Sequence, residues 1–361
     1  MQRNTLFALG ALGCVVGQSA YAQSSVSLYG LIDNGIAYVS NVGGKAEYNA
    51  VSGVLRADRF GMVGSEDLGG GLSAIFRLES GFSSTTGALM ASPAGSSAIF
   101  GRAAYVGLRS DFGTLTLGRQ MEYMSIMADY SAASYGGDIF FRPFTGKPVF
   151  PANGSGPDID GLSGTRMDNA VKYSFSDFHG LSGGVMYGFG NQAGEFSNGS
   201  AMSAGVRYEI SAVTLGGAYT DRKETNGDGS YRNYALGALI NFGSATANIL
   251  FTNSRWSLTG DDVDVIETGL RYQISASYYG ALTYQYLHPN HGQENELLKG
   301  NTNVVGLTFD HTLSKQTEVM ISAATHIGQE GYTVAPFFTF GAPNSGARTV
   351  TQVVATLLHR F

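Results

Sequence analysis

A period of two in hydrophobicity recurs through this sequence and constrains its fold more than any other feature. In residues 72–82 one face carries Leu, Ala, Phe, Leu, Ser and Phe, while the other carries Ser, Ile, Arg, Glu and Gly. Residues 166–175 and 266–272 alternate in the same way. Such segments are typical of β-strands with one apolar and one polar face. The pattern predicts about sixteen strands, near residues 25–40, 54–65, 71–83, 98–110, 113–120, 165–176, 180–190, 200–210, 213–222, 231–242, 245–256, 263–274, 278–288, 301–312, 317–328 and 349–361.

The predicted connections alternate between short and long. Short ones carry turn residues, as in residues 110–113 and 242–244, whereas longer ones are polar and rich in Gly, and residues 121–164 form the longest. This alternation indicates an all-β, sixteen-stranded antiparallel transmembrane barrel with short periplasmic turns and long external loops. We find no linker, so residues 23–361 form one predicted domain. A soluble β-sandwich or a surface β-rich adhesin is the alternative, but neither needs the alternating connection lengths.

The first 22 residues have the features of a secretory signal peptide. Arg3 precedes an apolar run over residues 6–16, and Ala20-Tyr21-Ala22 offers a cleavage site. Cleavage would remove Cys14, the one cysteine, so the mature chain could not build a thiolate metal site. The formal net charge of −6 would become −7 with the loss of Arg3. A net acidic chain is a poor general binder of nucleic acid, and we expect no such partner.

The last predicted strand, residues 349–361, alternates up to Phe361. With Phe361 toward lipid, the outward face would also carry Val353, Ala355 and Leu357, and the lumen would receive Thr356, Leu358 and Arg360. A barrel in lipid must close without a free edge, so this strand should pair with the first one. A terminal aromatic residue would lie in the interfacial girdle of aromatic side chains.

Several stretches resemble the general diffusion porins of Gram-negative outer membranes, of the type common in β-proteobacteria. They are residues 25–33 (SVSLYGLID), 59–72 (RFGMVGSEDLGGGL), 102–108 (RAAYVGL) and 113–120 (GTLTLGRQ), together with Phe361. The resemblance implies a homotrimer of sixteen-stranded barrels in outer-membrane lipid, through which small hydrophilic solutes and ions diffuse passively. It also implies that the barrel-insertion machinery reads Phe361 as part of an assembly signal.

The resemblance further implies that residues 121–164 are a third loop that folds into the barrel and narrows the pore. Their length and aromatic content agree with a packed, functional loop, although an external cap is the alternative. Matched to the family's arginine ladder, Arg59, Arg102 and Arg166 would line this constriction. Alternation by itself also turns Arg166 toward the lumen and does the same for Arg77 and Glu79. Asp129 and Asp138 are the candidate acids of the loop, and Glu122 lies further back.

The loop departs from the enterobacterial porin pattern in a way that bears on ion selectivity. Ser134 stands where that pattern has a Glu, and the loop adds Arg142 and Lys147. Charges at the narrowest section of a pore count most, because they act at close range. We therefore expect weak selectivity with a lean toward anions. A substrate-specific outer-membrane channel is the alternative function.

No motif in the sequence indicates an enzyme. The six histidines are scattered, and the sequence contains neither a His-Glu-x-x-His pair nor a Gly-x-Ser-x-Gly elbow. Two acidic stretches, residues 158–161 and 261–264, could bind Ca²⁺, but acidic loops are more often simply solvated. We expect no catalytic residues, no cofactor and no resident metal.

Overall fold

The computed structural model describes residues 25–90, 98–131, 166–291, 300–328 and 347–361, which form strands, turns and one short helix. The predicted signal peptide, residues 1–22, lies outside the described residues. Among the residues described, no helix is long and apolar enough to cross a membrane.

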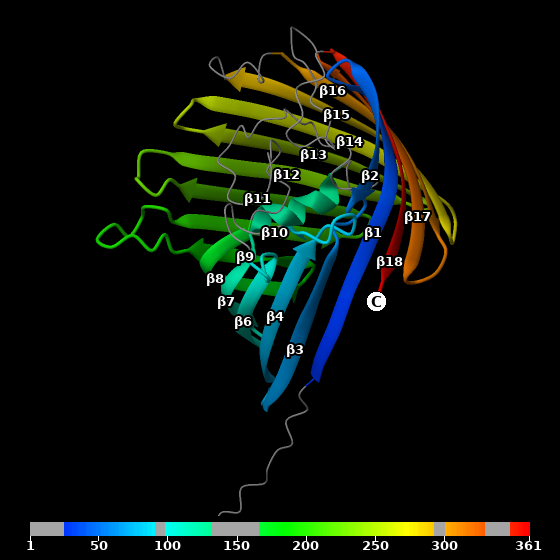
Figure 1. Ribbon diagram of the computed structural model, residues 1–361. Helices are drawn as coiled ribbons and strands as arrows, with labels where there is room; N and C mark the ends of the chain where they lie inside the picture. Colours follow the sequence, from blue (N-terminus) through cyan, green and yellow to red (C-terminus); the bar gives the residue numbers. More distant parts are fainter. Residues whose placement is uncertain (1–24, 91–97, 132–165, 292–299, 329–346) are drawn as a thin grey trace, which may run out of the picture.

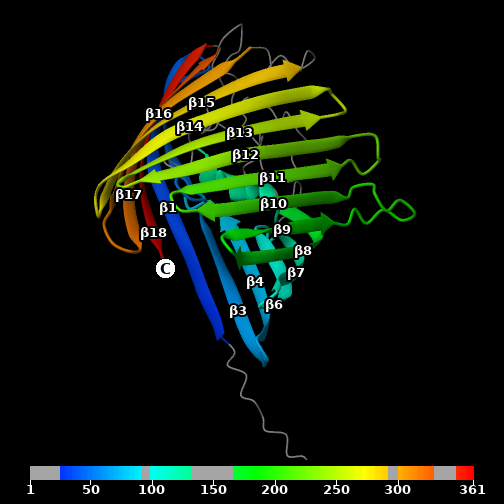
Figure 2. The same cartoon turned by 180° about the vertical axis from the view of Figure 1, so that it is seen from behind.

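The strands follow one another along the chain in a single antiparallel series (Figures 1 and 2). The first part contains β1 (Ser25–Val42), β2 (Lys45–Ser52), β3 (Arg59–Gly69), β4 (Leu72–Phe82), β5 (Leu89–Met90), β6 (Ala103–Ser110), β7 (Gly113–Met121), β8 (Arg166–Phe178) and β9 (Leu181–Gly188). The second part contains β10 (Ala201–Ile210), β11 (Val213–Lys223), β12 (Ser230–Phe242), β13 (Ala245–Trp256), β14 (Asp261–Ser275), β15 (Tyr278–His291), β16 (Thr302–Thr312), β17 (Thr317–Gly328) and β18 (Thr349–Arg360).

These segments close into a barrel because β18 pairs with β1, as between Leu31 and Arg360. β1 also pairs with β2 through residues 34–42 and with β3 through residues 25–31, so β2 and β3 share one position in the wall. β5 is a two-residue piece beside the end of β4. The eighteen segments therefore make sixteen barrel strands, which confirms the predicted fold class.

The connection lengths also follow the prediction, with two exceptions. At one end of the barrel the strands are joined by short turns, such as residues 111–112, 211–212 and 243–244. The other end carries the long loops, but residues 43–44 and 257–260 are short connections at that end too. Following the barrel rule, the short turns face the periplasm and the loop end faces outside.

Alternation along each strand separates a lipid face from a lumen face. On β18, Val353, Leu357 and the adjacent Phe361 are exposed, whereas Thr356 and Leu358 are buried in the lumen wall, as predicted. The outer faces of β12 to β17 carry exposed apolar residues such as Leu236, Ile249, Ile266, Leu282, Leu307 and Ile321. This apolar band suits a hydrocarbon environment, in which every backbone group is bonded within the wall.

Two local predictions were wrong. Residues 54–65 are not one strand, because residues 53–58 leave the wall between β2 and β3. On β8, the pairing with β7 shifts between Gly118 and Gln120, and Asn169 adopts a left-handed φ of 51°. This β-bulge breaks the alternation. Met167 is consequently buried inside, against Tyr123 and Ala170, instead of sharing the lipid face of Val171 and Tyr173.

Candidate functional site

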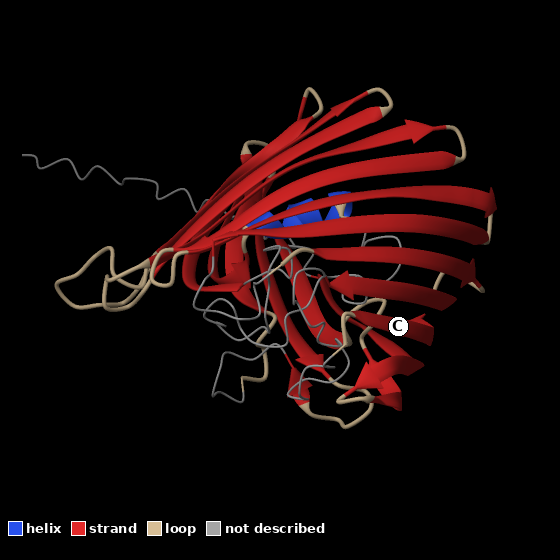
Figure 3. Cartoon of the chain, turned by 90° about the horizontal axis from the view of Figure 1, so that it is seen from above, coloured by secondary structure: helices blue, strands red, loops and turns tan. Residues whose placement is uncertain are grey.

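The third loop begins inside the barrel. After β7, the 3₁₀ helix η1 (Tyr123–Tyr130) contacts β9 to β13, and Figure 3 shows it within the ring of strands. Met124, Met127 and Tyr130 are fully buried against the lumen face of Ala218, Ala235 and Leu250. The predicted inward fold is thus confirmed for the described start of the loop, although the helix itself was not expected.

Polar contacts fix both ends of η1 to the wall. Lys172 Nζ donates to the Met121 carbonyl at 2.8 Å and lies 4.3 Å from the centre of the Tyr123 ring. Glu122 is buried and pairs with Arg222 of β11 at 3.3 Å. At the other end, Asn248 Nδ2 donates to the Tyr130 carbonyl at 2.6 Å and Ser131 Oγ donates to Glu267 at 2.5 Å. Removing one partner of a buried ion pair is strongly destabilising, so these anchors hold the helix against the wall.

Glycines on the lumen face make room for Tyr130. A Cβ on Gly237 would lie 2.8 Å from Tyr130 Cβ, and a Cβ on Gly216 would meet the tip of the same ring. Contacts under 3.0 Å require one group to move. The wall at this point therefore accepts the helix only because both positions lack a side chain.

We expect Gly237→Val to push η1 toward the centre of the lumen and so lower the single-channel conductance. Overpacking of this kind typically costs about 1–3 kcal/mol. Planar-bilayer recording measures the effect. Gly217→Val is the matched control, because Gly217 faces outward and its nearest neighbour would be the Leu236 side chain at 3.2 Å. Equal conductance in the two variants would contradict the proposed packing of η1.

The opposite part of the wall carries a group of five arginines, called the arginine cluster below: Arg59 of β3, Arg77 of β4, Arg102 just before β6, Arg119 of β7 and Arg166 of β8. Its centre is Glu79 of β4, which is buried. The Glu79 carboxylate accepts three hydrogen bonds: from Arg102 Nε at 2.7 Å, from Arg77 Nη2 at 2.5 Å and from the Tyr29 hydroxyl at 2.6 Å. The predicted lumen placement of Arg77 and Glu79 agrees with the register, which sets them opposite Val63 and Gly61 of β3.

The other two ladder arginines join this cluster. Arg166 Nε donates to the Arg102 carbonyl at 2.9 Å, and the charges of Arg102 and Arg59 both act on Arg166. Arg59 Nε donates to the Ala57 carbonyl at 2.9 Å. The structure thus brings together the three arginines that the family resemblance selected. Arg102 precedes β6, so strand alternation does not govern the direction of its side chain.

The candidate acids of the loop are placed differently. Asp129, on η1, pairs with Arg207 of β10 at 3.2 Å, and Arg207 also pairs with Glu209 at 2.9 Å. The Asp129 carboxylate therefore has a cationic partner on β10. Asp138 lies outside the described residues, as do Ser134, Arg142 and Lys147.

Sequence reasoning missed three basic residues of the lumen. Arg207 and Arg222 lie on the lumen faces of β10 and β11, and alternation along those strands could have found them. Arg119 pairs with Asp168 at 2.6 Å beside the β8 bulge, where alternation fails. Arg119, Arg166 and Arg222 line one pocket of about 310 Å³.

The acidic stretch at residues 261–264 does not gather into a cation site. Asp261 is buried on the lumen side and accepts from Thr259 Oγ1 at 2.7 Å. Asp262 and Asp264 face outward, and both accept from Asn253 Nδ2, at 2.7 and 2.8 Å. In the described residues no group of three or more His, Cys, Asp or Glu side chains could hold a metal ion.

A closed barrel with an inward loop and a charged lumen defines an outer-membrane channel. A family model described as Gram-negative porin matches residues 7–329, so the chain belongs to the Gram-negative porin family. It is 32% identical over 272 residues to an outer membrane porin protein of Bordetella pertussis, covering 66% of each chain. It is 28% identical over 336 residues to outer membrane porin protein 32 of Delftia acidovorans, covering 87% of each.

A solved structure extends the likeness to three dimensions. The anion-selective porin from Comamonas acidovorans superposes with a TM-score of 0.76 at 25% sequence identity. The match covers 94% of this chain and 100% of that one. The predicted family and the predicted outer-membrane location are both confirmed.

Proposed function

We propose that this porin is a water-filled channel through which small hydrophilic solutes and ions diffuse passively, with a weak preference for anions. The main observation behind this proposal is the excess of positive charge in the arginine cluster. Arg59, Arg77, Arg102, Arg119 and Arg166 outnumber its two carboxylates, Glu79 and Asp168. The comparison porin is itself described as anion-selective, which supports the same reading.

The described loop acids do not offset this excess. Glu122 pairs with Arg222, and Asp129 shares Arg207 with Glu209. Asp129 and Glu209 together with Arg207 keep one negative charge, which is smaller than the excess of three positive charges in the arginine cluster. Fields at a narrow section act through little intervening water and govern selectivity. We assign Arg59, Arg102 and Arg166, with Arg77 and Glu79, to the pore constriction on this basis.

Reversal potentials in a KCl gradient test this function directly. Purified protein in a planar bilayer should form open channels, and the sign of the potential should show preference for chloride. Clear preference for potassium would overturn the anion lean and would direct attention to Asp129, Asp138 and Glu79. Absence of channels would overturn the function as a whole.

A substrate-specific channel is the second candidate, and the basic pocket beside Arg166 favours it. A channel with such a site would show conductance that saturates with the concentration of a small carboxylate anion. A general diffusion porin would show conductance proportional to the salt concentration.

We also propose that the chain forms a homotrimer in outer-membrane lipid and is inserted by the barrel-insertion machinery. The outward apolar band and the resemblance of residues 59–72 and Phe361 to porin sequences support this. The mass of the detergent-extracted complex, measured by light scattering, tests the trimer, and a monomeric mass would refute it. No catalytic role is proposed.

A further inference from the structure

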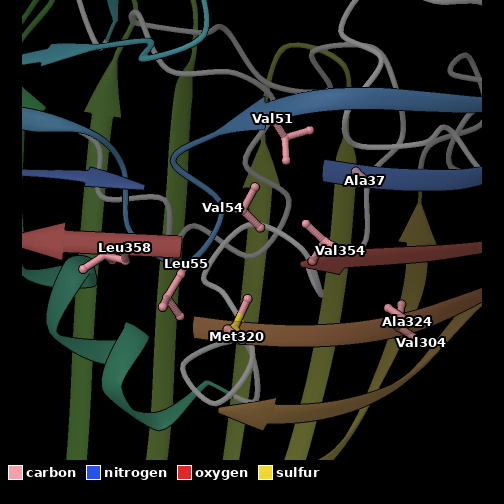
Figure 4. Close-up of a cluster of buried hydrophobic side chains, with 9 residues drawn as sticks. All are labelled: Ala37, Val51, Val54, Leu55, Val304, Met320, Ala324, Val354 and Leu358. Carbon is pink, nitrogen blue, oxygen red and sulfur yellow. The ribbon is translucent and has the colours of Figure 1, made fainter. Parts of the chain in front are cut away.

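The interruption between β2 and β3 carries a feature that the channel function does not require. Residues 53–58 turn into the lumen, where Val54 and Leu55 are almost fully buried. They cover an apolar cluster on the lumen face of β1, β2 and β16 to β18, formed by Ala37, Val51, Val304, Met320, Ala324, Val354 and Leu358 (Figure 4). Barrel interiors of this class are usually polar and wet. An apolar patch there is stable only when something covers it.

Two carboxylates hold the segment in place. Asp33 of β1 accepts from the backbone N–H groups of Leu55 at 2.5 Å and Arg56 at 2.9 Å. Asp58 accepts from the backbone of Asp33 at 2.6 Å and from Ser52 Oγ at 2.7 Å. Hydrogen bonds to ionised acceptors are among the strongest in proteins. The segment is therefore fixed from both ends, and its position inside the barrel is set by the wall itself.

This anchoring directs Arg56 away from the apolar cluster. Its side chain is exposed, and Nη1 donates to the Leu55 carbonyl at 3.1 Å. In the part of the chain that the structure describes, no carboxylate pairs with Arg56. Arg56 directly follows Leu55, which packs on the apolar cluster of β16 to β18, and it lies three residues before Arg59 of the arginine cluster.

We propose that residues 53–58 form a second constriction, separate from the third loop, and that Arg56 is a selectivity residue that meets small anions there. The proposal rests on the proposed channel function. Two properties support it: the segment takes up lumen space over β16 to β18, and its one basic side chain, that of Arg56, has no carboxylate partner among the described residues. The helix η1, the described start of the third loop, lies against β9 to β13, so the two elements occupy different walls.

Chemical modification of Arg56→Cys tests this within single open channels. A negatively charged methanethiosulfonate reagent, added during planar-bilayer recording, should form a mixed disulfide with the new thiol and release sulfinate. We expect a stepwise loss of current, together with a shift of the reversal potential toward cations. Lys315→Cys is the matched control, because Lys315 is exposed in the periplasmic turn of residues 313–316 and loses the same charge. That variant should show no step.

The outcomes separate this proposal from the channel function. Steps in the Arg56→Cys channel and none in the Lys315→Cys channel support the second constriction. Open Arg56→Cys channels whose current and reversal potential are unchanged by the reagent would overturn it and leave the channel function intact. If the unmodified protein forms no channels at all, the function itself fails. Because each channel is compared with itself before and after modification, the test needs only channels that have already folded and inserted.

Discussion

Replacing Arg59, Arg102 and Arg166 together by serine should abolish the anion preference and make the channel favour cations. A unit charge about 10 Å from an ion in water changes its energy by ~0.4 kcal/mol, so three charges contribute ~1.2 kcal/mol. Salt screening reduces this energy. The energy has opposite signs for anions and cations, so both changes shift the permeability ratio in the same direction. We expect the ratio of anion to cation permeability to fall about tenfold, since ~1.4 kcal/mol corresponds to a factor of ten. The reversal potential in a KCl gradient measures the ratio.

A charge-matched control separates the local field from net charge. Replacing Arg232, Arg255 and Lys315 by serine removes three positive charges from exposed positions on the outer face or in a turn. This control should keep the selectivity of the unmodified channel. The triple arginine variant should also have a higher single-channel conductance, because serine takes up less of the lumen than arginine. Unchanged selectivity in the triple arginine variant would show that Arg59, Arg102 and Arg166 do not line the constriction.

The strand order could be predicted because alternation is a local property of the sequence. Each strand needs an apolar face toward lipid, so nearly every wall segment carries its own pattern. The β8 bulge breaks this alternation, because one extra residue is inserted near Asn169. Met167 therefore faces inward, although the pattern predicts that it faces lipid. The inward turn of residues 53–58 was missed for a similar reason. Val54 and Leu55 read as strand residues, but they pack on a lumen cluster contributed by distant strands.

The composition of the site could be predicted only in part. Arg59, Arg102 and Arg166 were found through family resemblance, and the structure gathers them beside Glu79. The pairs that compensate the loop acids join residues far apart in sequence, as between Glu122 and Arg222 or between Asp129 and Arg207. Alternation tells which face a residue occupies but not which distant residue meets it. Pairing therefore had to come from the folded chain.

Deleting Phe361 should sharply reduce the amount of assembled barrel in the outer membrane. Phe361 closes the seam: its N–H donates to the Gly30 carbonyl at 3.0 Å, and the Gly30 N–H donates to its carbonyl at 3.0 Å. The ring also lies over Gly30, where any Cβ would overlap it. Without the residue, two backbone groups of β1 lose their partners near lipid, at about 1–3 kcal/mol for each buried group. Heat-modifiable gel migration of the outer-membrane fraction, at native expression level, measures assembly.

A second variant divides this effect between the backbone and the ring. Phe361→Ala keeps both backbone hydrogen bonds but removes the aromatic group that covers Gly30 and that the family resemblance ties to recognition by the insertion machinery. If the ring is the recognised feature, Phe361→Ala should assemble as poorly as the deletion, and Phe361→Tyr should restore assembly. If closure of the seam dominates, Phe361→Ala should assemble well and only the deletion should fail. Normal assembly of the deletion variant would contradict both explanations, because the barrel would then form with its β1–β18 seam shortened and its aromatic residue absent.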